Sequence, residues 1–216
     1  MLTIHTAGLL VTGDRRPALP DGAVLVDGRA CAAMGPYEEL VAAHPTARVR
    51  RWPGLLTPGL LNPYGPELLE QAYHPDPREA DELGTRPIVG EALAELALSD
   101  TRRGASARRG VQRMLAHGTV AVAGTLTRPA VVDAVYRAGL TQEERFERPE
   151  SPPSLDPLAG RSLAEAMLMP LPPDGDDGRD ATFAVFDVPD EAALVERGAG
   201  TCVATVVAGR LVHRRR

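Results

Sequence analysis

The sequence predicts an α+β fold in which both ends of the chain contribute to one composite, β-sandwich-like layer around a middle of helices and strands. Residues 1–50 carry strand and turn signals, and residues 181–216 repeat the same pattern. The segment between them alternates helical patterns with short apolar runs. With 216 residues, 44% of them hydrophobic and 25% charged, the composition is that of a soluble globular protein with a normal core.

The N-terminal segment contains a predicted hairpin, a short helix and a strand. Residues 24–26 are apolar and precede Asp27-Gly28, a dipeptide suited to a type I′ turn. Pro36 to Ala43 is predicted to be a short helix with Pro in its first turn. Residues 47–54 then alternate apolar side chains with arginines and fit a strand.

The C-terminal segment repeats this order of elements. DATFAVFDVP is a predicted strand, DEAALVER a predicted helix, and TCVATVVAGRLVHRRR a second hairpin that turns at Ala208-Gly209. We expect the two β-rich ends to pair into one small antiparallel layer. Two unrelated hairpins are the alternative.

The middle of the chain predicts parallel α/β units. Helical spacing covers Glu67 to Tyr73, Ile88 to Ala97 and residues 105–117, the last of these ending before Gly118. The apolar strand TVAVAGT follows, and then a helix that ends at Gly139. This order of strand and helix is typical of a parallel sheet.

A long segment rich in Pro, Gly and Asp, residues 148–179, is predicted to be an exposed connection around a weak helix, Gly160 to Met169. We therefore divide the chain into three parts. They are a composite β domain (1–60 and 180–216), an α/β segment (61–147) and this connection.

Five segments, taken in order, resemble the amidohydrolase superfamily, in particular its imidazolonepropionase-like and aminodeoxyfutalosine-deaminase-like members. The segments are DGAVLVDGRACAAMGPYEEL, WPGLLTPGLLN, MLAHGTVAVAGT, DATFAVFDVP and TVVAGRLVHRR. The resemblance covers about residues 1–65, 105–140 and 180–216. It implies a (β/α) TIM-barrel hydrolase with a composite β-sandwich. It also implies a divalent metal, held by a His-x-His pair after the first barrel strand. Such a metal activates water to attack carbon–nitrogen bonds.

The positions that the resemblance assigns to the His-x-His pair are occupied by Asn62 and Tyr64. An amide oxygen and a protonated phenol are poor ligands for zinc or iron. With Pro63 between them and Gly65 after them, the segment predicts a tight turn rather than a ligand pair. A complete barrel also takes about 250 residues. Residues 61–179 show only two clear barrel-type strands, so we expect an incomplete barrel remnant.

The five histidines do not restore a metal site, and we expect structural or solvent-exposed roles for all of them: His5, His44, His74, His117 and His213. A cation cluster of His74, Asp76, Glu79 and Asp81 is conceivable, but a solvated turn is the favoured interpretation. The acidic run at 174–180 resembles a calcium loop without its final glutamate, which favours a flexible linker.

Other candidate groups were weighed against structural roles. Ser106 lacks the sequence context of a nucleophile, and Cys31 and Cys202 are predicted to be small apolar strand residues. Five arginines between 102 and 113 could form a basic face for a phosphate or an acidic partner; the alternative is a solvated face balanced by nearby acids. They are Arg102, Arg103, Arg108, Arg109 and Arg113. The chain has no lysine, which excludes a Schiff base or a P-loop lysine.

The sequence therefore predicts a catalytically degenerate amidohydrolase-like protein, a pseudoenzyme that acts as a binding or interaction module without a metal. The alternative is a hydrolase of non-peptide carbon–nitrogen bonds that uses zinc or iron, with a site completed by another chain. We expect a homo-oligomer or a protein partner to cover the incomplete barrel. A net charge of −5 gives no reason to expect nucleic acid. The absence of a long apolar run predicts a cytoplasmic protein without a membrane segment.

Overall fold

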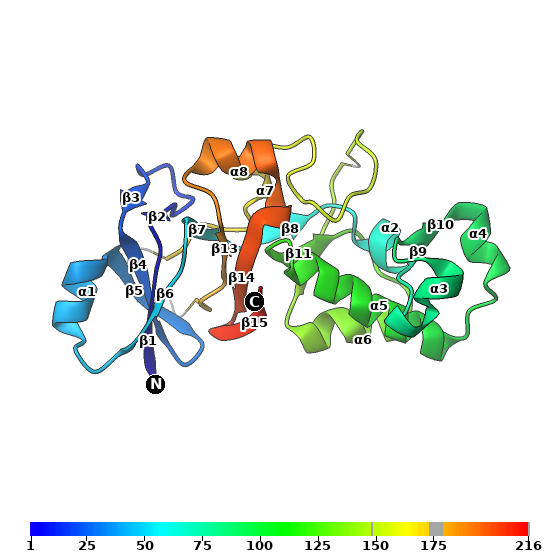
Figure 1. The fold of residues 1–216 in the computed structure, drawn as a ribbon, viewed down its shortest axis with the longest axis horizontal. Helices are drawn as coiled ribbons and strands as arrows, with labels where there is room; N and C mark the ends of the chain where they lie inside the picture. The colour runs from blue at the N-terminus through cyan, green and yellow to red at the C-terminus, as the bar shows by residue number, and fades with distance from the viewer. Residues whose placement is uncertain (148, 173–178, 216) are drawn as a thin grey trace.

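The protein is described from a computed structural model that covers residues 1–147, 149–172 and 179–215. The molecule is elongated (Figure 1). Strands from both ends of the chain occupy one half, and the helices of the middle segment extend from the other half. The α+β class is therefore the one expected from the sequence.

The first sheet is N-terminal and has four strands in the order β5-β4-β1-β6. β1 pairs antiparallel with β4 and parallel with β6. Helix α1 crosses over between β5 and β6, as the Pro36 signal predicts, and buries Leu40. The bounds are β1 (Leu2–Thr6), β4 (Gly22–Asp27), β5 (Ala30–Pro36), α1 (Tyr37–Ala43) and β6 (Arg48–Arg51).

The second sheet is the composite one, with six strands in the order β15-β14-β13-β7-β2-β3. Its central pairing joins β7 from the N-terminal part to β13 from the C-terminal part. The bounds are β2 (Leu9–Leu10), β3 (Leu19–Pro20), β7 (Leu55–Pro58), β13 (Phe183–Phe186), β14 (Cys202–Val207) and β15 (Arg210–Arg214), with α8 (Glu191–Arg197) and the 3-10 turn η2 (Ala199–Thr201) between β13 and β14.

The expectation of one antiparallel layer was wrong in two respects. The N-terminal hairpin β4–β5 belongs to the first sheet, whereas the C-terminal hairpin belongs to the composite sheet. The composite sheet is also mixed, because β2 runs parallel to β7. Apolar side chains of the two sheets share one core, in which Val24, Val26 and Cys31 meet Phe183 and Val185. This is the face-to-face packing of a β-sandwich.

The two hairpin turns differ in conformation. Ala208 and Gly209 both have positive φ, 47° and 72°, as a type I′ turn requires. In the first hairpin Asp27 pairs with Ala30 inside the ladder, so the turn residues are Gly28 and Arg29, and of these only Gly28 has a positive φ. The type I′ turn predicted at Asp27-Gly28 was therefore wrong, because the strand runs one residue further than expected.

A third, parallel sheet lies in the middle segment, with the order β12-β11-β8. The expected strand and helix units are present, with α5 and α6 as the helices, and α6 ends at Gly139 in a left-handed conformation. β12 is a third parallel strand where the sequence showed only two, and within the described residues these strands form an open sheet. The bounds are β8 (Leu60–Asn62), α5 (Asp100–Leu115), β11 (Thr119–Ala123), α6 (Pro129–Ala138) and β12 (Thr141–Glu143).

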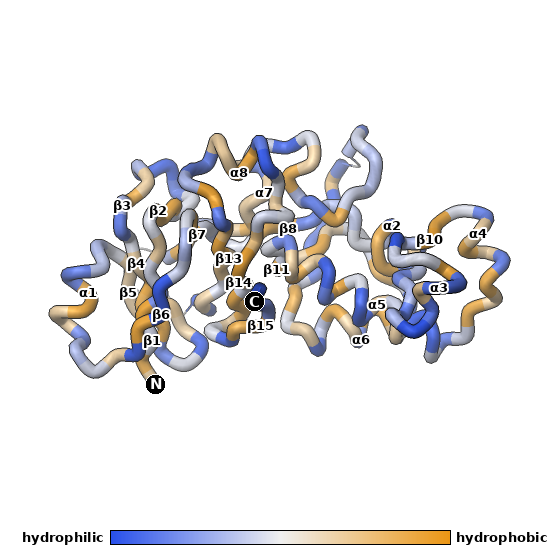
Figure 2. Tube along the Cα trace, in the orientation of Figure 1, coloured by the Kyte–Doolittle hydropathy of each residue, from blue (hydrophilic) through white to orange (hydrophobic). Residues whose placement is uncertain are grey.

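An excursion of mixed polarity separates β8 from α5; it is hydrophobic around α2 and α4 and strongly hydrophilic around α3 (Figure 2). The helix predicted for Glu67 to Tyr73 ends early, because Ala72-Tyr73 pairs as a strand with Ile88-Val89. The same pairing shortens the helix predicted from Ile88. The bounds are α2 (Gly65–Leu69), β9 (Ala72–Tyr73), the 3-10 turn η1 (Pro77–Glu79), α3 (Ala80–Leu83), β10 (Ile88–Val89) and α4 (Gly90–Glu95).

Residues 149–172 of the connection pack in part on the protein, in contrast to the exposed segment that was expected. Its helix is the single turn α7 (Leu163–Ala166), held by a capping box at Ser162. Leu158, Leu163 and Leu171 are buried. Met167 makes a bridge to Leu60 of β8, so the connection occupies one edge of the parallel sheet.

Among the described residues, no helix has both the length and the apolarity needed to cross a membrane.

Candidate functional site

Asn62 and Tyr64 lie where β8 ends and α2 begins, at the carboxyl end of the parallel sheet. Ligands usually bind at this end of parallel α/β sheets. Asn62 is fully buried. Its Oδ1 accepts a hydrogen bond of 3.0 Å from the backbone N–H of Tyr64, and its Nδ2 donates one of 2.9 Å to the carbonyl oxygen of Ser154. The segment is thus an Asx turn, in agreement with the predicted tight turn.

The Tyr64 side chain is equally committed to the protein. Its ring packs in the helical core with Leu68 and Met114. Its hydroxyl lies 2.6 Å from both the carbonyl oxygen and the Oγ of Ser151. Both side chains that stand at the expected metal positions therefore bind the connection segment.

Two arginines reinforce the same junction. Arg161 donates to the carbonyl oxygen of Leu61 over 3.0 Å, and burial lowers the pKa of its guanidinium. Arg145 donates to the carbonyl oxygen of Pro63 over 3.0 Å and forms an ion pair of 2.9 Å with Glu67. The backbone on both sides of Asn62 is thereby held by side chains from after β12.

The residues at this junction do not fit a catalytic divalent metal. Such a site needs about three imidazole, thiolate or carboxylate donors that converge on one point. The described residues contain no group of three His, Cys, Asp or Glu side chains arranged to hold a metal. The carboxylate of Glu67, in the first turn of α2, is paired with Arg145.

Four of the five histidines lie away from this junction. His5 is buried in β1, where its Nδ1 accepts from Trp52 Nε1 over 3.1 Å. Burial, with nearby Arg50 and Arg48, lowers its pKa to about 4. His117 bonds to the carbonyl oxygen of Arg113 through Nδ1. His213 lies in β15, where it pairs with Thr205 of β14. His44 follows α1 as its C-cap. These positions agree with structural roles.

His74 is fully buried, which corrects its placement in a solvated turn. Its Nε2 lies 2.8 Å from the carbonyl oxygen of Leu68, and its backbone N–H donates to Ser106 Oγ over 2.8 Å. Burial lowers the pKa of its imidazole. Ser106 is buried in α5, so its hydroxyl positions this turn and does not face a substrate.

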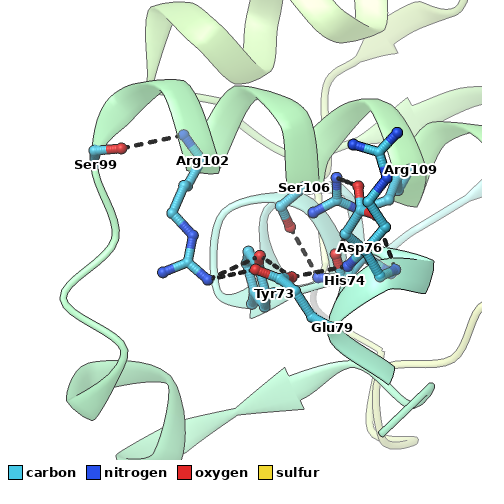
Figure 3. Close-up of polar contacts among 9 residues, drawn as sticks. Tyr73, His74, Asp76, Glu79, Ser99, Arg102, Ser106 and Arg109 are labelled. Carbon is cyan, nitrogen blue, oxygen red and sulfur yellow. Dashed lines mark hydrogen bonds and ion pairs between the residues drawn. The ribbon is translucent and has the colours of Figure 1, made fainter. Parts of the chain in front are cut away.

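The acidic turn and the basic helix face are partners of each other (Figure 3). Arg102 forms an ion pair of 2.7 Å with Glu79, and Arg109 one of 3.3 Å with Asp76. Glu79 also accepts from Tyr73 Oη over 2.6 Å. These contacts, the Tyr73 hydroxyl first, lower the pKa of Glu79 to about 2. The alternative of a helix face balanced by nearby acids therefore holds for Arg102 and Arg109.

The other candidate groups have simpler positions. Asp81 is exposed in α3 outside these pairs, and Arg113 donates to the carbonyl oxygen of Thr85. Cys31 and Cys202 are buried free cysteines in strands, as expected. Of the calcium-like run, 174–178 lies outside the described residues, and Asp180 pairs with Arg29 over 2.7 Å.

Two cavities escaped the sequence analysis, because their walls come from segments far apart in the chain. One, of about 920 Å³, lies between α6, the start of β12, residues 168–172 and the turns of the two hairpins. The other, of about 880 Å³, lies beside α2 and α4 and includes residues 153–155 of the connection. Both volumes are in the range of small-molecule sites.

Comparison with protein-family models finds no match, and comparison with curated proteins finds none either. Among solved structures, ochratoxinase from A. niger matches 66% of this chain at 20% identity with a TM-score of 0.46. Guanine deaminase from E. coli matches 64% at 19% identity with a TM-score of 0.45, and aminofutalosine deaminase from Helicobacter pylori matches 74% at 16% identity with a TM-score of 0.44.

These structural neighbours are an ochratoxinase and two deaminases, and at these identities the likeness concerns the fold alone. The matched region spans 31%, 33% and 37%, respectively, of the three neighbouring chains. This chain therefore corresponds to about a third of the length of each of them.

Proposed function

We propose that this protein is a catalytically degenerate amidohydrolase-like chain that works as a binding or interaction module, without metal-dependent hydrolysis. One observation carries the proposal. The two side chains at the expected metal positions, Asn62 and Tyr64, are hydrogen-bonded to Ser154 and Ser151 of the connection. Side chains that hold a segment of their own chain in place are not free to coordinate an ion.

The test is metal content per chain, measured by plasma mass spectrometry on untagged protein purified without chelator. We expect zinc, iron and manganese well below one equivalent, both before and after incubation with excess zinc and desalting. Near-stoichiometric metal would overturn the proposal. So would hydrolysis of a carbon–nitrogen substrate that is abolished by Asn62→Ala or Tyr64→Phe and unaffected by Gln112→Ala, an exposed position on α5. Either result would favour the alternative, a hydrolase.

The interaction partner that we propose is a second copy of the chain, paired along β12. Within the described residues β12 lies at the edge of its sheet, and an open edge is a template for further pairing. Antiparallel self-pairing centred on Gln142 would place Thr141 of one copy opposite Glu143 of the other, which avoids like charges across the ladder. It would also cover Val132 and Tyr136 of α6, which are 39% and 81% exposed.

The oligomeric state tests this partner. We expect light scattering to show a molar mass that rises toward that of a dimer with concentration, and Tyr136→Arg to prevent the rise. Arg137→Gln, on the same helix, is the matched control. A mass that stays monomeric at high concentration would rule out self-pairing and leave a different protein as the partner.

A further inference from the structure

The cavity beside α2, about 880 Å³ in volume, has an apolar lining within a charged rim. It is walled by α2, by β10 and α4, by the first turn of α5, by the residue before α6 and by residues 153–155. Its apolar surface comes from Leu68, Pro87, Val89, Leu93 and Leu155. An apolar cavity of this size with a few polar groups is the usual form of a small-molecule site.

The carboxylates at this cavity are already satisfied. Glu67 pairs with Arg145. Glu70 accepts hydrogen bonds from the backbone N–H groups of Thr127 and Arg128, over 2.7 and 2.6 Å, and from the Thr127 hydroxyl over 3.1 Å. Both carboxylates therefore already have partners within the protein.

The three arginines at the same cavity are in the opposite situation. Arg86, Arg103 and Arg128 line it, and no side chain of the described residues forms an ion pair with them. On the same helix as Arg103, Arg102 and Arg109 do have carboxylate partners. The rim therefore carries a local excess of positive charge.

Two of these arginines lie at helix N-termini. Arg103 lies in the first turn of α5, a helix of 16 residues, and Arg128 is the N-cap of α6, a helix of 10 residues. The N-terminus of a helix is its positive end, where a cation is unfavourable and an anion is favourable. Glu70 already accepts from the backbone N–H of Arg128 at the start of α6, and Asp100 lies in the first turn of α5. The charge excess at the rim therefore rests on the three guanidinium groups rather than on the helix ends.

We propose that this cavity binds a small organic anion, with a carboxylate or phosphate group on an apolar body. Guanidinium groups of Arg103 and Arg128 would hold the anionic group through charge-assisted hydrogen bonds, often bidentate for such ligands. The apolar body would contact Leu68, Leu93 and Leu155. Binding of an anion in this cavity is independent of whether the chain binds a metal and of its oligomeric state.

Titration calorimetry with 1-naphthoate and 1-naphthyl phosphate tests it, with uncharged 1-naphthalenemethanol as the comparison ligand. We expect saturable binding of at least one of the two anions, weakened by added salt because the contacts are charged. Arg103→Gln and Arg128→Gln should each raise the dissociation constant about tenfold or more, because each variant loses one charge-assisted contact. Leu93→Asp should also weaken binding.

The control variant is Arg108→Gln, because Arg108 is exposed on α5 and does not line the cavity. It should leave the dissociation constant unchanged, and the thermal midpoint of each variant shows whether it is folded. The proposal is overturned if neither anion binds, if the alcohol binds as tightly as the anions, or if folded Arg103→Gln and Arg128→Gln proteins bind like the parent. A result in which Arg108→Gln has the same effect as Arg103→Gln would also reject it, because only general surface charge would then matter.

Discussion

The side-chain amide of Asn62 donates a hydrogen bond of 2.9 Å to the carbonyl oxygen of Ser154, which lies 92 positions later in the chain. The same side chain accepts from the backbone of Tyr64. One buried amide therefore shapes the turn after β8 and anchors the connection above it.

Asn62→Ala should destabilise the protein by about 2–4 kcal/mol, because it leaves the buried backbone N–H of Tyr64 and the partly buried carbonyl oxygen of Ser154 without partners. Chemical denaturation measures the change in the free energy of unfolding. Gln112→Ala, an exposed position on α5, is the control and should change it by less than about 0.5 kcal/mol. A loss for Asn62→Ala as small as that of the control would mean that these hydrogen bonds do not stabilise the junction.

Tyr64→Phe should release the connection while leaving the core packed. The substitution keeps the buried ring and removes only the hydroxyl that contacts Ser151, at a cost of about 1 kcal/mol. Hydrogen exchange should become faster at the backbone N–H groups of Asp156 and Leu158, which are hydrogen-bonded within the connection, and stay unchanged in β13. Tyr136→Phe is the matched control, because the Tyr136 side chain is 81% exposed. Unchanged exchange at Asp156 and Leu158 would contradict an anchoring role for Tyr64.

His5 should make the protein less stable as the pH falls. Its pKa is lowered from 6.5 to about 4 in the folded protein, so between these values the unfolded chain binds a proton that the folded one does not. The stabilisation is complete above pH 6.5 and declines by at most ~1.4 kcal/mol per pH unit below it. His74 and His213, whose pKa values are also lowered by burial, act in the same direction.

The His5→Gln variant separates the contribution of His5 from that of the other two histidines. Glutamine can still accept from Trp52 Nε1 but does not titrate. Unfolding measured from pH 7.5 to 5 should show a shallower loss of stability for this variant than for the parent. Parallel curves would show that His5 titrates normally in the folded protein.

Gly54 and Gly28 should respond differently to alanine. Both have positive φ, 67° and 58°, so each substitution carries a backbone penalty of about 1 kcal/mol. A Cβ at Gly54 would also overlap the carbonyl oxygen of Phe186 and approach the nitrogen of Val188 to 2.7 Å, whereas a Cβ at Gly28 meets nothing within 4 Å. We expect Gly54→Ala to cost about 3 kcal/mol or more and Gly28→Ala about 1 kcal/mol, from thermal or denaturant unfolding. Equal costs would contradict the tight approach of β13 to Gly54.

The parts of the fold that depend on local sequence were predictable. Ala208-Gly209 selects its turn, Gly139 ends α6, and the Asx turn at Asn62 follows from the residues around it. The third parallel strand was missed because Thr141–Glu143 is short, polar and partly exposed, which leaves no apolar run to identify it.

Contacts between distant segments could not be predicted in this way. The sequence shows basic residues at 102 and 109 and acidic ones at 76 and 79, but their pairing depends on the docking of η1 against α5. The packing of residues 149–172 depends likewise on Asn62 and Tyr64. Their partners, Ser154 and Ser151, have no distinctive sequence context. The cavities combine walls from several such contacts and are invisible until the chain is folded.

The pairing of β7 with β13 has a consequence for synthesis of the protein. Leu55 pairs with Phe186, and Pro58 with Phe183, so β7 lacks one of its two neighbours until the ribosome has also made the chain as far as Phe186. Loops of this length slow folding, and an apolar strand that waits for its neighbour is prone to aggregate. The nascent chain is therefore expected to need protection by a chaperone until β13 leaves the ribosomal tunnel.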